Sequence, residues 1–181
     1  DIQTLTSLGC HPAPVVTAIT VQDTAGVKQF LPVEAGLVIA QARAILEDMP
    51  VAAIKTGMLG SIDNLTALAG ILNDYPDIPL IVDPVLASGG GVALSDEPIE
   101  EALHALLLPQ TTLLTPNTLE ARRLAPDADS IDACGQALLT AGCQFVLITG
   151  THENTPTVIN RLYAESRLPE SFTSARLPPQ T

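Results

Sequence analysis

Residues 80–85 read LIVDPV and are followed by LASGGG at residues 86–91. An apolar strand there runs into an acidic, glycine-rich exit, and ligands of α/β sheets bind at such carboxyl ends of strands. The pattern recurs where LLT at residues 113–115 runs into PNTLE at residues 116–120. Two strand ends therefore present Asp83, Asn117 and Glu120. We expect these residues to meet in one crevice that holds a cation or a polar ligand.

Apolar runs rich in β-branched residues alternate with helical spacing along most of the chain. The expected strands are Val15–Val21, Val51–Thr56, Leu80–Val85, Thr112–Thr115 and Phe145–Thr149. Helical spacing occurs at residues 2–8, 38–46, 62–72, 103–107 and 131–138, with caps at Ser61 and Ser130 and stops at Gly9 and Gly142. Apolar strands linked by crossover helices predict a largely parallel sheet with helices on both faces. The tail after Tyr163 shows no such periodicity.

Composition indicates one globular domain, residues 1–181, and argues against several classes of partner. The 181 residues are 46% hydrophobic and 3% aromatic, which suits one core of aliphatic side chains. A formal charge of -12 with only eight Lys and Arg residues leaves no basic stripe for a nucleic-acid backbone. No apolar run reaches the roughly 20 residues of a membrane span. Neither nucleic acid nor a membrane is therefore an expected partner.

Cysteine, histidine and motif patterns exclude further mechanisms. The three cysteines include no C-x-x-C pair, which argues against a disulfide framework or a zinc site and favours a reducing cytoplasm. His11, His104 and His152 have no partner at metal-ligand spacing. The chain contains no G-x-S-x-G, H-E-x-x-H, P-loop or G-x-G-x-x-G motif. The glycines at residues 89–91 can approach a ligand closely or form a mobile surface loop.

Each candidate at a strand end also has a structural explanation. Gln22 can simply end a strand, and Met58 and Val85 can fill the core. Asp83 can begin a turn, and Glu120 can stabilise the first turn of a helix through the helix dipole. The residues by themselves leave these alternatives open.

Five ordered segments together carry a family resemblance. They are TAITVQDT at residues 17–24, KTGML at 55–59, VDPV at 82–85, TPNTLEA at 115–121 and ITGTH at 148–152. In this order they resemble the hydroxymethylpyrimidine/phosphomethylpyrimidine kinase family of thiamin biosynthesis, which belongs to the ribokinase-like superfamily. The resemblance covers nearly the whole chain and is weakest from Tyr163 onward. It implies a three-layer α/β sandwich with a mostly parallel central sheet and helices on both faces.

The resemblance implies a phosphotransferase that uses ATP and Mg²⁺. The acceptor would be the hydroxymethyl group of 4-amino-5-hydroxymethyl-2-methylpyrimidine, and then its monophosphate. By similarity, Gln22 would hydrogen-bond the pyrimidine edge, while Met58 and Val85 would pack against the ring. The expected partners are therefore a small pyrimidine and ATP, and the expected assembly is a homodimer.

By the same similarity, the polar strand ends would bind the metal and the nucleotide. Asp83 and Glu120 would lie around Mg²⁺, partly through water because this ion keeps much of its hydration shell. Asn117, Thr149 and Gly150 would bind the nucleotide. This division suits phosphoryl transfer, which needs in-line positioning and neutralisation of charge on the phosphate oxygens.

The chain departs from the family pattern at both ends. An N-terminal strand with an Asp-Ser-Gly-Gly segment is expected before Asp1. A glycine-rich anion-hole segment whose last residue is the catalytic base is expected after Thr181. We therefore expect the 181 residues alone to be inactive, and no catalytic residue is assigned within them. Some relatives also have Lys at the position of Thr149, which affects the expected nucleotide contacts there.

Two alternative functions follow from these considerations. A pyridoxal or pyridoxine kinase would share the architecture and differ in the ring that it binds, and Gln22 and Met58 favour the pyrimidine. A protein without the base would instead be a non-catalytic pyrimidine-binding regulatory module.

Overall fold

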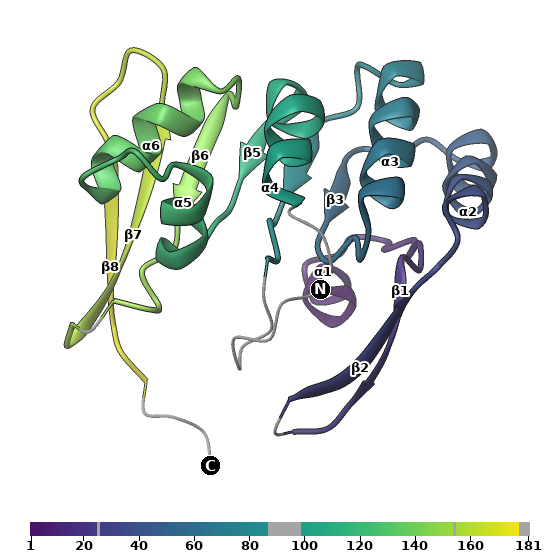
Figure 1. Cartoon of the computed structure of the whole chain (residues 1–181), viewed down its shortest axis with the longest axis horizontal. Coiled ribbons are helices and arrows are strands. Elements are labelled where there is room, and N and C mark those ends of the chain that lie inside the picture. The colour runs from purple at the N-terminus through teal and green to yellow at the C-terminus, as the bar shows by residue number, and fades with distance from the viewer. Residues whose placement is uncertain (25, 87–98, 154, 178–181) are drawn as a thin grey trace.

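The computed structural model describes residues 1–24, 26–86, 99–153 and 155–177 (Figure 1). In chain order the elements are α1 (Ile2–Ser7), β1 (Ala18–Gln22), β2 (Val27–Pro32), α2 (Ala35–Asp48), β3 (Ile54–Thr56), α3 (Ile62–Asp74), β4 (Leu80–Val82), α4 (Ile99–Ala102), a π-helical turn (Leu103–Leu107), a 3₁₀ turn (Leu108–Gln110), β5 (Leu113–Leu114), α5 (Thr118–Leu124), α6 (Ile131–Thr140), β6 (Phe145–Ile148), β7 (Thr157–Ala164) and β8 (Glu170–Ala175). The glycine-rich segment 89–91 lies outside the described residues. None of the described helices combines the length and the apolarity that a membrane crossing requires.

The main sheet has six strands in the order β3-β4-β5-β6-β7-β8. Strands β3 to β6 are parallel, and β7 and β8 continue the sheet in antiparallel pairing. The four apolar runs that the sequence predicts at 51–56, 80–85, 112–115 and 145–149 supply the parallel strands, with shorter bounds. The predicted mostly parallel sheet is confirmed.

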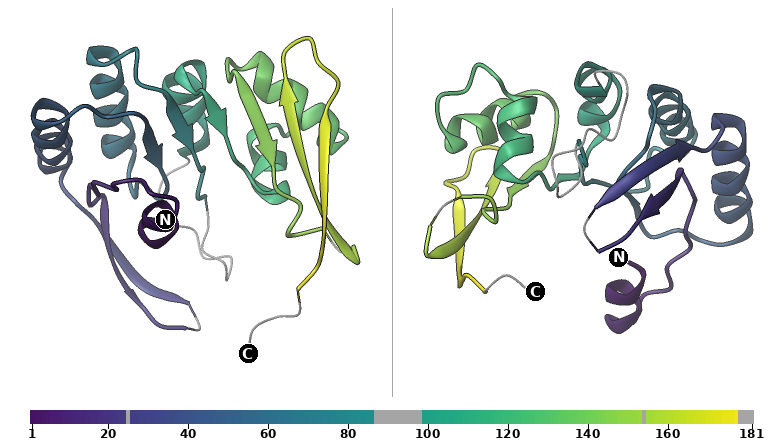
Figure 2. Two further views of the ribbon diagram at one scale, coloured as in Figure 1. Left: turned by 180° about the vertical axis from the view of Figure 1, so that it is seen from behind. Right: turned by 60° about the horizontal axis from the view of Figure 1, so that its bottom comes forward.

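Helices α3 to α6 cover one face of this sheet. Helices α3 to α6 lie in front of the strands in Figure 1 and behind them in the reversed view of Figure 2. Residues that face them are almost completely buried, as at Leu114 and Val146, both 0% exposed. On the other face, Ile81 pairs with Leu113, which pairs with Phe145, and Phe145 is 38% exposed. Helix α1 lies on this second side of the sheet, opposite α3 to α6 (Figure 2).

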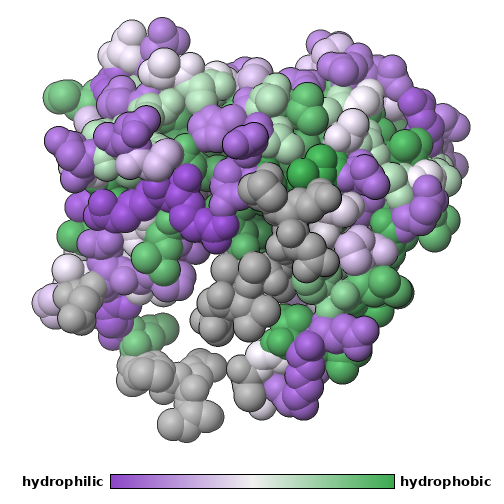
Figure 3. All heavy atoms as spheres, in the orientation of Figure 1, coloured by the Kyte–Doolittle hydropathy of each residue, from purple (hydrophilic) through white to green (hydrophobic). Residues whose placement is uncertain are grey.

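The helix side carries a polar outer surface, as expected for amphipathic helices. Hydrophilic residues gather over α5 and α6 in the space-filling view (Figure 3). Beneath them, Leu124 and Leu138 are at most 1% exposed and pack in the core. Hydroxyl caps begin two of the helices as predicted. Ser61 Oγ accepts from the Asn64 amide at 3.2 Å, and Ser130 Oγ accepts from the Ala133 amide at 3.1 Å.

The first predicted strand does not join the main sheet. Strand β1 pairs antiparallel with β2, and the two form a separate two-stranded sheet. The base of this hairpin is held by Asn64, which is 0% exposed and donates to the carbonyls of Thr17 at 3.1 Å and Leu59 at 2.9 Å. The prediction placed Val15–Val21 in the parallel series because the strand is apolar. In its pairing partner, β2, apolar and polar residues alternate too weakly for the strand to be recognised from the sequence.

The segment around and after Tyr163 is also more regular than predicted. Strand β7 runs to Ala164, and β8 pairs with it over Glu170–Ala175. Every residue of β8 is exposed, so its sequence lacks the alternation of apolar and polar residues that predicts a half-buried strand. Main-chain pairing with β7 produces this strand.

A glycine in α6 tests the packing of this helix on β7. A Cβ atom at Gly135 would lie 2.7 Å from the ring of Tyr163, which is 0% exposed and donates its hydroxyl to Asp132 Oδ1 at 2.6 Å. Gly135→Ala should therefore lower the free energy of unfolding by about 1–3 kcal/mol through overpacking. Urea unfolding measures this change.

Gly70 in α3 is the matched control, because a Cβ atom there meets no atom within 4 Å. Gly70→Ala should raise the free energy of unfolding by roughly 0.5–1 kcal/mol, since alanine favours the helix interior. Equal effects of the two substitutions would contradict the close contact between Gly135 and Tyr163.

Candidate active site

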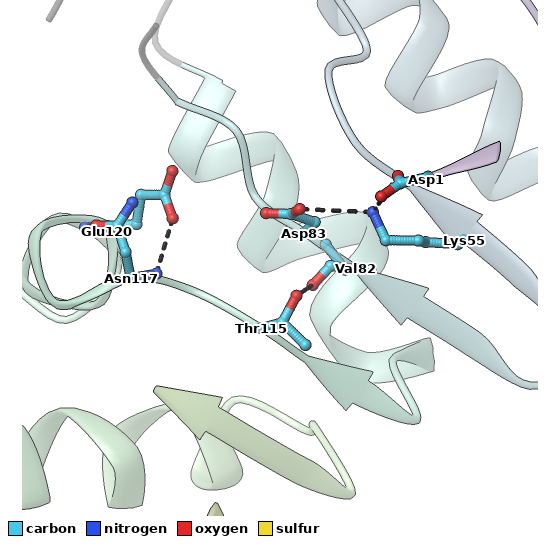
Figure 4. Close-up of polar contacts among 7 residues, drawn as sticks. All are labelled: Asp1, Lys55, Val82, Asp83, Thr115, Asn117 and Glu120. Atoms are coloured by element: carbon cyan, nitrogen blue, oxygen red, sulfur yellow. Dashed lines mark hydrogen bonds and ion pairs between the residues drawn. The ribbon is translucent and has the colours of Figure 1, made fainter. Parts of the chain in front are cut away.

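The exits of the parallel strands lie side by side and are joined by main-chain hydrogen bonds. Beyond the last paired residues of β3 and β4, the Asp83 amide donates to the Thr56 carbonyl at 3.0 Å. The Thr115 amide donates to the Val82 carbonyl at 2.8 Å, and its hydroxyl donates to the same oxygen at 3.3 Å. Figure 4 shows that this alignment brings Asp83 and Glu120 to the same side of the strand ends. The predicted convergence of the two exits is present.

Lys55 neutralises part of the acidic charge at these exits. Its Nζ lies 2.7 Å from Asp1 Oδ2 and 3.5 Å from Asp83 Oδ2 (Figure 4). Lys55 was not among the predicted site residues, although it belongs to the KTGML segment at residues 55–59. A charged residue inside the otherwise apolar run 51–56 was the available signal. Asp83 also begins a turn, since its carbonyl accepts from the Val85 amide at 2.9 Å, so the structural alternative for Asp83 is present.

Asn117 and Glu120 form a capping box at the start of α5. Asn117 Oδ1 accepts from the amides of Leu119 at 2.9 Å and Glu120 at 3.0 Å. In return, Glu120 Oε2 accepts from the Asn117 amide at 2.9 Å. The structural alternative for Glu120 is thus present in this helix turn. The same contacts fix its carboxylate at the exit of β5.

Glu120 is also electrostatically coupled to the neighbouring groups. It is 8% exposed, and this burial raises the pKa of its carboxyl group above the ordinary value. The hydrogen bond from the Asn117 amide opposes the rise, while the negative charge of Asp83 adds to it and His152 acts in the lowering direction. A carboxylate whose ionisation is disfavoured by burial and by a second carboxylate nearby is a suitable ligand for a divalent cation.

The exit of β6 lies against the start of α5. The Thr149 amide donates to the Pro116 carbonyl at 2.9 Å, and the Thr118 amide donates to the Thr149 carbonyl at 3.2 Å. A parallel bridge also joins Thr149 to Asn117. The next residue, Gly150, donates its amide to Asn160 Oδ1 at 3.1 Å. The three residues predicted for the nucleotide, Asn117, Thr149 and Gly150, are therefore neighbours.

The three residues predicted for the pyrimidine are only partly gathered. Val85 lines a narrow recess together with Thr56 and Asp83. The Thr56 hydroxyl, which was not among the predicted site residues, is buried and has no hydrogen-bond partner in the part of the chain that the structure describes. The Met58 carbonyl accepts from the Thr17 hydroxyl at 2.6 Å, which joins the exit of β3 to the hairpin base. Gln22 is exposed at the far end of β1, where the register of the hairpin shifts.

The donor set fits a hydrated ion better than a cage of protein ligands. Among residues 1–24, 26–86, 99–153 and 155–177, no group of three or more His, Cys, Asp or Glu side chains could hold a metal. Mg²⁺ is usually bound by one or two carboxylates, substrate phosphates and several waters. Asp83 and Glu120 are two such carboxylates, and Figure 4 shows them at adjacent strand exits.

A larger groove of about 470 Å³ lies elsewhere, between α2 and α3. Ile39, Gly70 and Ile71 contribute to its lining, and two of its three charged residues, Arg43 and Asp74, pair with each other. None of the predicted site residues lines this groove. The strand exits therefore remain the candidate active site.

Comparison with known proteins identifies the family. The family model described as phosphomethylpyrimidine kinase matches residues 1–181. The chain belongs to the phosphomethylpyrimidine kinase family. A hydroxymethylpyrimidine/phosphomethylpyrimidine kinase of Mycobacterium bovis is 41% identical over 157 residues, which are 84% of this chain and 57% of that protein. The thiamine biosynthesis bifunctional protein ThiED of Geobacter sulfurreducens is 36% identical over 84% of this chain and 32% of its own length.

Solved structures agree with the ribokinase-like fold class. The phosphomethylpyrimidine kinase of Clostridium difficile 630 has a TM-score of 0.83 and 28% identity, covering 94% of this chain and 75% of that chain. A Staphylococcus aureus pyridoxal kinase, solved with AMP-PCP and pyridoxal, has a TM-score of 0.84 at 24% identity, covering 99% and 66%. At this identity, the similarity to the pyridoxal kinase concerns the fold alone. The kinase-family chain described here spans little more than half the length of the M. bovis relative.

The buried Glu120 carboxyl predicts a pH dependence of stability. Because its pKa is raised in the folded protein, the folded state holds the proton more tightly than the unfolded state. The protonated Glu120 carboxyl group makes its full contribution to stability when the pH is below the ordinary pKa of 4.5. That contribution is lost as the pH rises through the raised pKa. Glu120→Gln keeps an oxygen for the Asn117 amide and removes the titration. Its free energy of unfolding should therefore fall less than that of the wild type as the pH rises from 4.5 towards neutrality.

Urea unfolding of both proteins without divalent cations measures the difference. Asp129→Asn, at an exposed position, controls for the loss of one negative charge. Parallel pH profiles for wild type and Glu120→Gln would contradict the raised pKa.

Proposed function

We propose that the full-length protein transfers the γ-phosphoryl group of ATP to the hydroxymethyl group of 4-amino-5-hydroxymethyl-2-methylpyrimidine, and then to its monophosphate. The main support is the family match over residues 1–181. The meeting of Asp83, Asn117 and Glu120 at adjacent strand exits gives that match a chemical basis. Phosphoryl transfer depends mainly on positioning and on neutralising phosphate charge.

We assign the binding of Mg²⁺ to Asp83 and Glu120. Bound there, the ion would neutralise charge on the phosphate oxygens of ATP. Lys55 holds one side of the Asp83 carboxylate, and the capping box holds Glu120. The two carboxylates are thereby oriented by contacts that do not involve the ion, as preorganised sites require.

We assign the nucleotide to the exits of β5 and β6, and the pyrimidine to Met58, Val85 and Gln22. Thr149 is bridged to Asn117 and is followed by Gly150, so a phosphate there would meet the start of α5 and the exit of β6 together. Met58 and Val85 provide apolar surface at the exits of β3 and β4. Gln22, on the hairpin, would supply the polar contact to the ring edge. We also propose a cytoplasmic location, supported by three cysteines that form no disulfide.

The acceptor decides between this function and its alternatives. In an ADP-release assay on the full-length protein with Mg²⁺, we expect turnover that depends on the hydroxymethylpyrimidine and exceeds turnover with pyridoxal. Gln22→Ala should lower kcat/KM for the pyrimidine by a factor equivalent to about 1–3 kcal/mol of lost transition-state binding, because a ring atom is left without its hydrogen-bond partner. The KM for ATP should stay unchanged. Gln29→Ala, an exposed glutamine on the other strand of the hairpin, is the matched control.

Preferential turnover of pyridoxal would favour the pyridoxal kinase alternative. Binding of the pyrimidine without turnover of either compound would favour a regulatory module. Equal behaviour of Gln22→Ala and Gln29→Ala would remove Gln22 from the site.

We further propose that the protein is a homodimer that uses the exposed face of the hairpin. Ile19 pairs with Leu31 across the hairpin, and together with Val21 they are 57–63% exposed. Apolar side chains that gather on one exposed face commonly mark a contact surface, and a self-complementary face suits a two-fold dimer.

Leu31→Glu should convert the dimer to a monomer in sedimentation velocity, because it places a charge in the apolar contact. Leu168→Glu, at a residue that is 90% exposed outside the hairpin, should leave the assembly unchanged. A monomeric wild type, or a dimer that tolerates Leu31→Glu, would refute this proposal.

A further inference from the structure

Arg176, which follows β8, is bound to main-chain carbonyls of the segment between β6 and β7. We call residues 149–153, 155 and 156 the exit loop; residue 154 lies outside the described part of the chain. Arg176 Nη1 donates to the Thr151 carbonyl at 2.6 Å, Nη2 to the Glu153 carbonyl at 2.5 Å and Nε to the Thr155 carbonyl at 2.8 Å. The planar guanidinium group, with five donors in a fixed arrangement, can satisfy several carbonyls at once.

Asn160 on β7 holds the first part of the same loop. Its Oδ1 accepts from the Gly150 amide at 3.1 Å. The loop approaches β7 so closely there that a Cβ atom at Gly150 would lie 2.2 Å from the Ile159 carbonyl oxygen. Glycine is therefore required at position 150 by packing against β7, whatever ligand the loop binds.

The exit loop adjoins the proposed nucleotide and metal site. Its first residue, Thr149, is bridged to Asn117, and His152 lies close enough to lower the pKa of Glu120. The carbonyl of Thr151 points to Arg176, so the trans peptide directs the His152 amide away from the guanidinium group. Arg176 is one of only eight Lys and Arg residues in the chain, and its donors bind the protein's own main chain.

We infer that Arg176 and Asn160 are positioning residues that hold the exit loop in the conformation that binds the nucleotide phosphates. The inference rests on the proposed assignment of Thr149 and Gly150 to the nucleotide. A loop that is already ordered binds its ligand without an added entropic cost, whereas a released loop must be ordered on binding. Loss of either residue should therefore weaken nucleotide binding selectively, because the predicted pyrimidine residues lie on other segments.

The test compares variants of the full-length protein that remove or keep each contact. Arg176→Met and Asn160→Leu remove the contacts. Asn160→Asp keeps an oxygen that accepts from the Gly150 amide, and Arg176→Lys keeps the charge but cannot reproduce the fork of donors. Arg167→Met, which removes an exposed arginine near the turn after β7, is the matched control. Thermal unfolding followed by circular dichroism identifies variants that remain folded.

Calorimetric titration with ADP and Mg²⁺ measures nucleotide affinity, and steady-state kinetics gives the KM values for ATP and for the pyrimidine. We expect Arg176→Met and Asn160→Leu to weaken ADP binding and raise the KM for ATP on the order of 10-fold, with the KM for the pyrimidine unchanged. Asn160→Asp should restore wild-type affinity, and Arg176→Lys should restore it only in part. Hydrogen exchange at the Gly150 amide should be faster in Asn160→Leu and unchanged in Asn160→Asp.

Three results would overturn the inference. In the first, the Arg176→Met and Asn160→Leu variants are folded and bind ADP as tightly as Arg167→Met does. Arg176 and Asn160 would then have no positioning role, while the nucleotide assignment could still be correct. In the second, both KM values rise together, which indicates a general structural effect. In the third, the wild type binds no ADP, and then the proposed function fails first.

Discussion

Parallel pairing of β3, β4, β5 and β6 is the constraint on which the candidate site depends. Strands that run in one direction end at one edge of the sheet, so the residues after each strand become neighbours. Main-chain hydrogen bonds extend this alignment beyond the strands, from Asp83 to Thr56 and from Thr115 to Val82. The side chains at these exits are consequently placed by the sheet itself. A site on such a frame takes the positions of its main chain from the sheet.

Several residues at the exits stabilise the fold and shape the site at the same time. The capping box of Asn117 and Glu120 satisfies amides at the start of α5, and caps of this kind typically contribute about 0.5–2 kcal/mol. The same box holds a carboxylate in a buried place near Asp83, where ionisation is disfavoured. A divalent cation would lower that cost. Helix stability and metal binding are therefore compatible uses of the same side chains.

Positive charge is scarce in this acidic chain and is used for internal contacts. Lys55 pairs with Asp1 and Asp83, and Arg176 binds three main-chain carbonyls of the exit loop. Neither side chain is thereby aimed at a ligand phosphate. Under the proposed function, an anionic substrate would therefore be bound by backbone amides and by a cation.

The amino-acid sequence by itself determined the elements whose signals are local. Apolar runs at 80–85 and 113–115 predicted the parallel strands, Ser61 and Ser130 predicted helix starts, and the polar residues after the strands predicted the shared edge. Only the tertiary structure decided that β1 leaves the main sheet, that exposed β8 extends it, and that Lys55 meets Asp83. It also decided that Asn160 receives the Gly150 amide. The physical reason is that these features depend on partners that are distant in the chain. Main-chain hydrogen bonds between two strands, or a single contact between two side chains, leave no periodic pattern in the sequence of either segment.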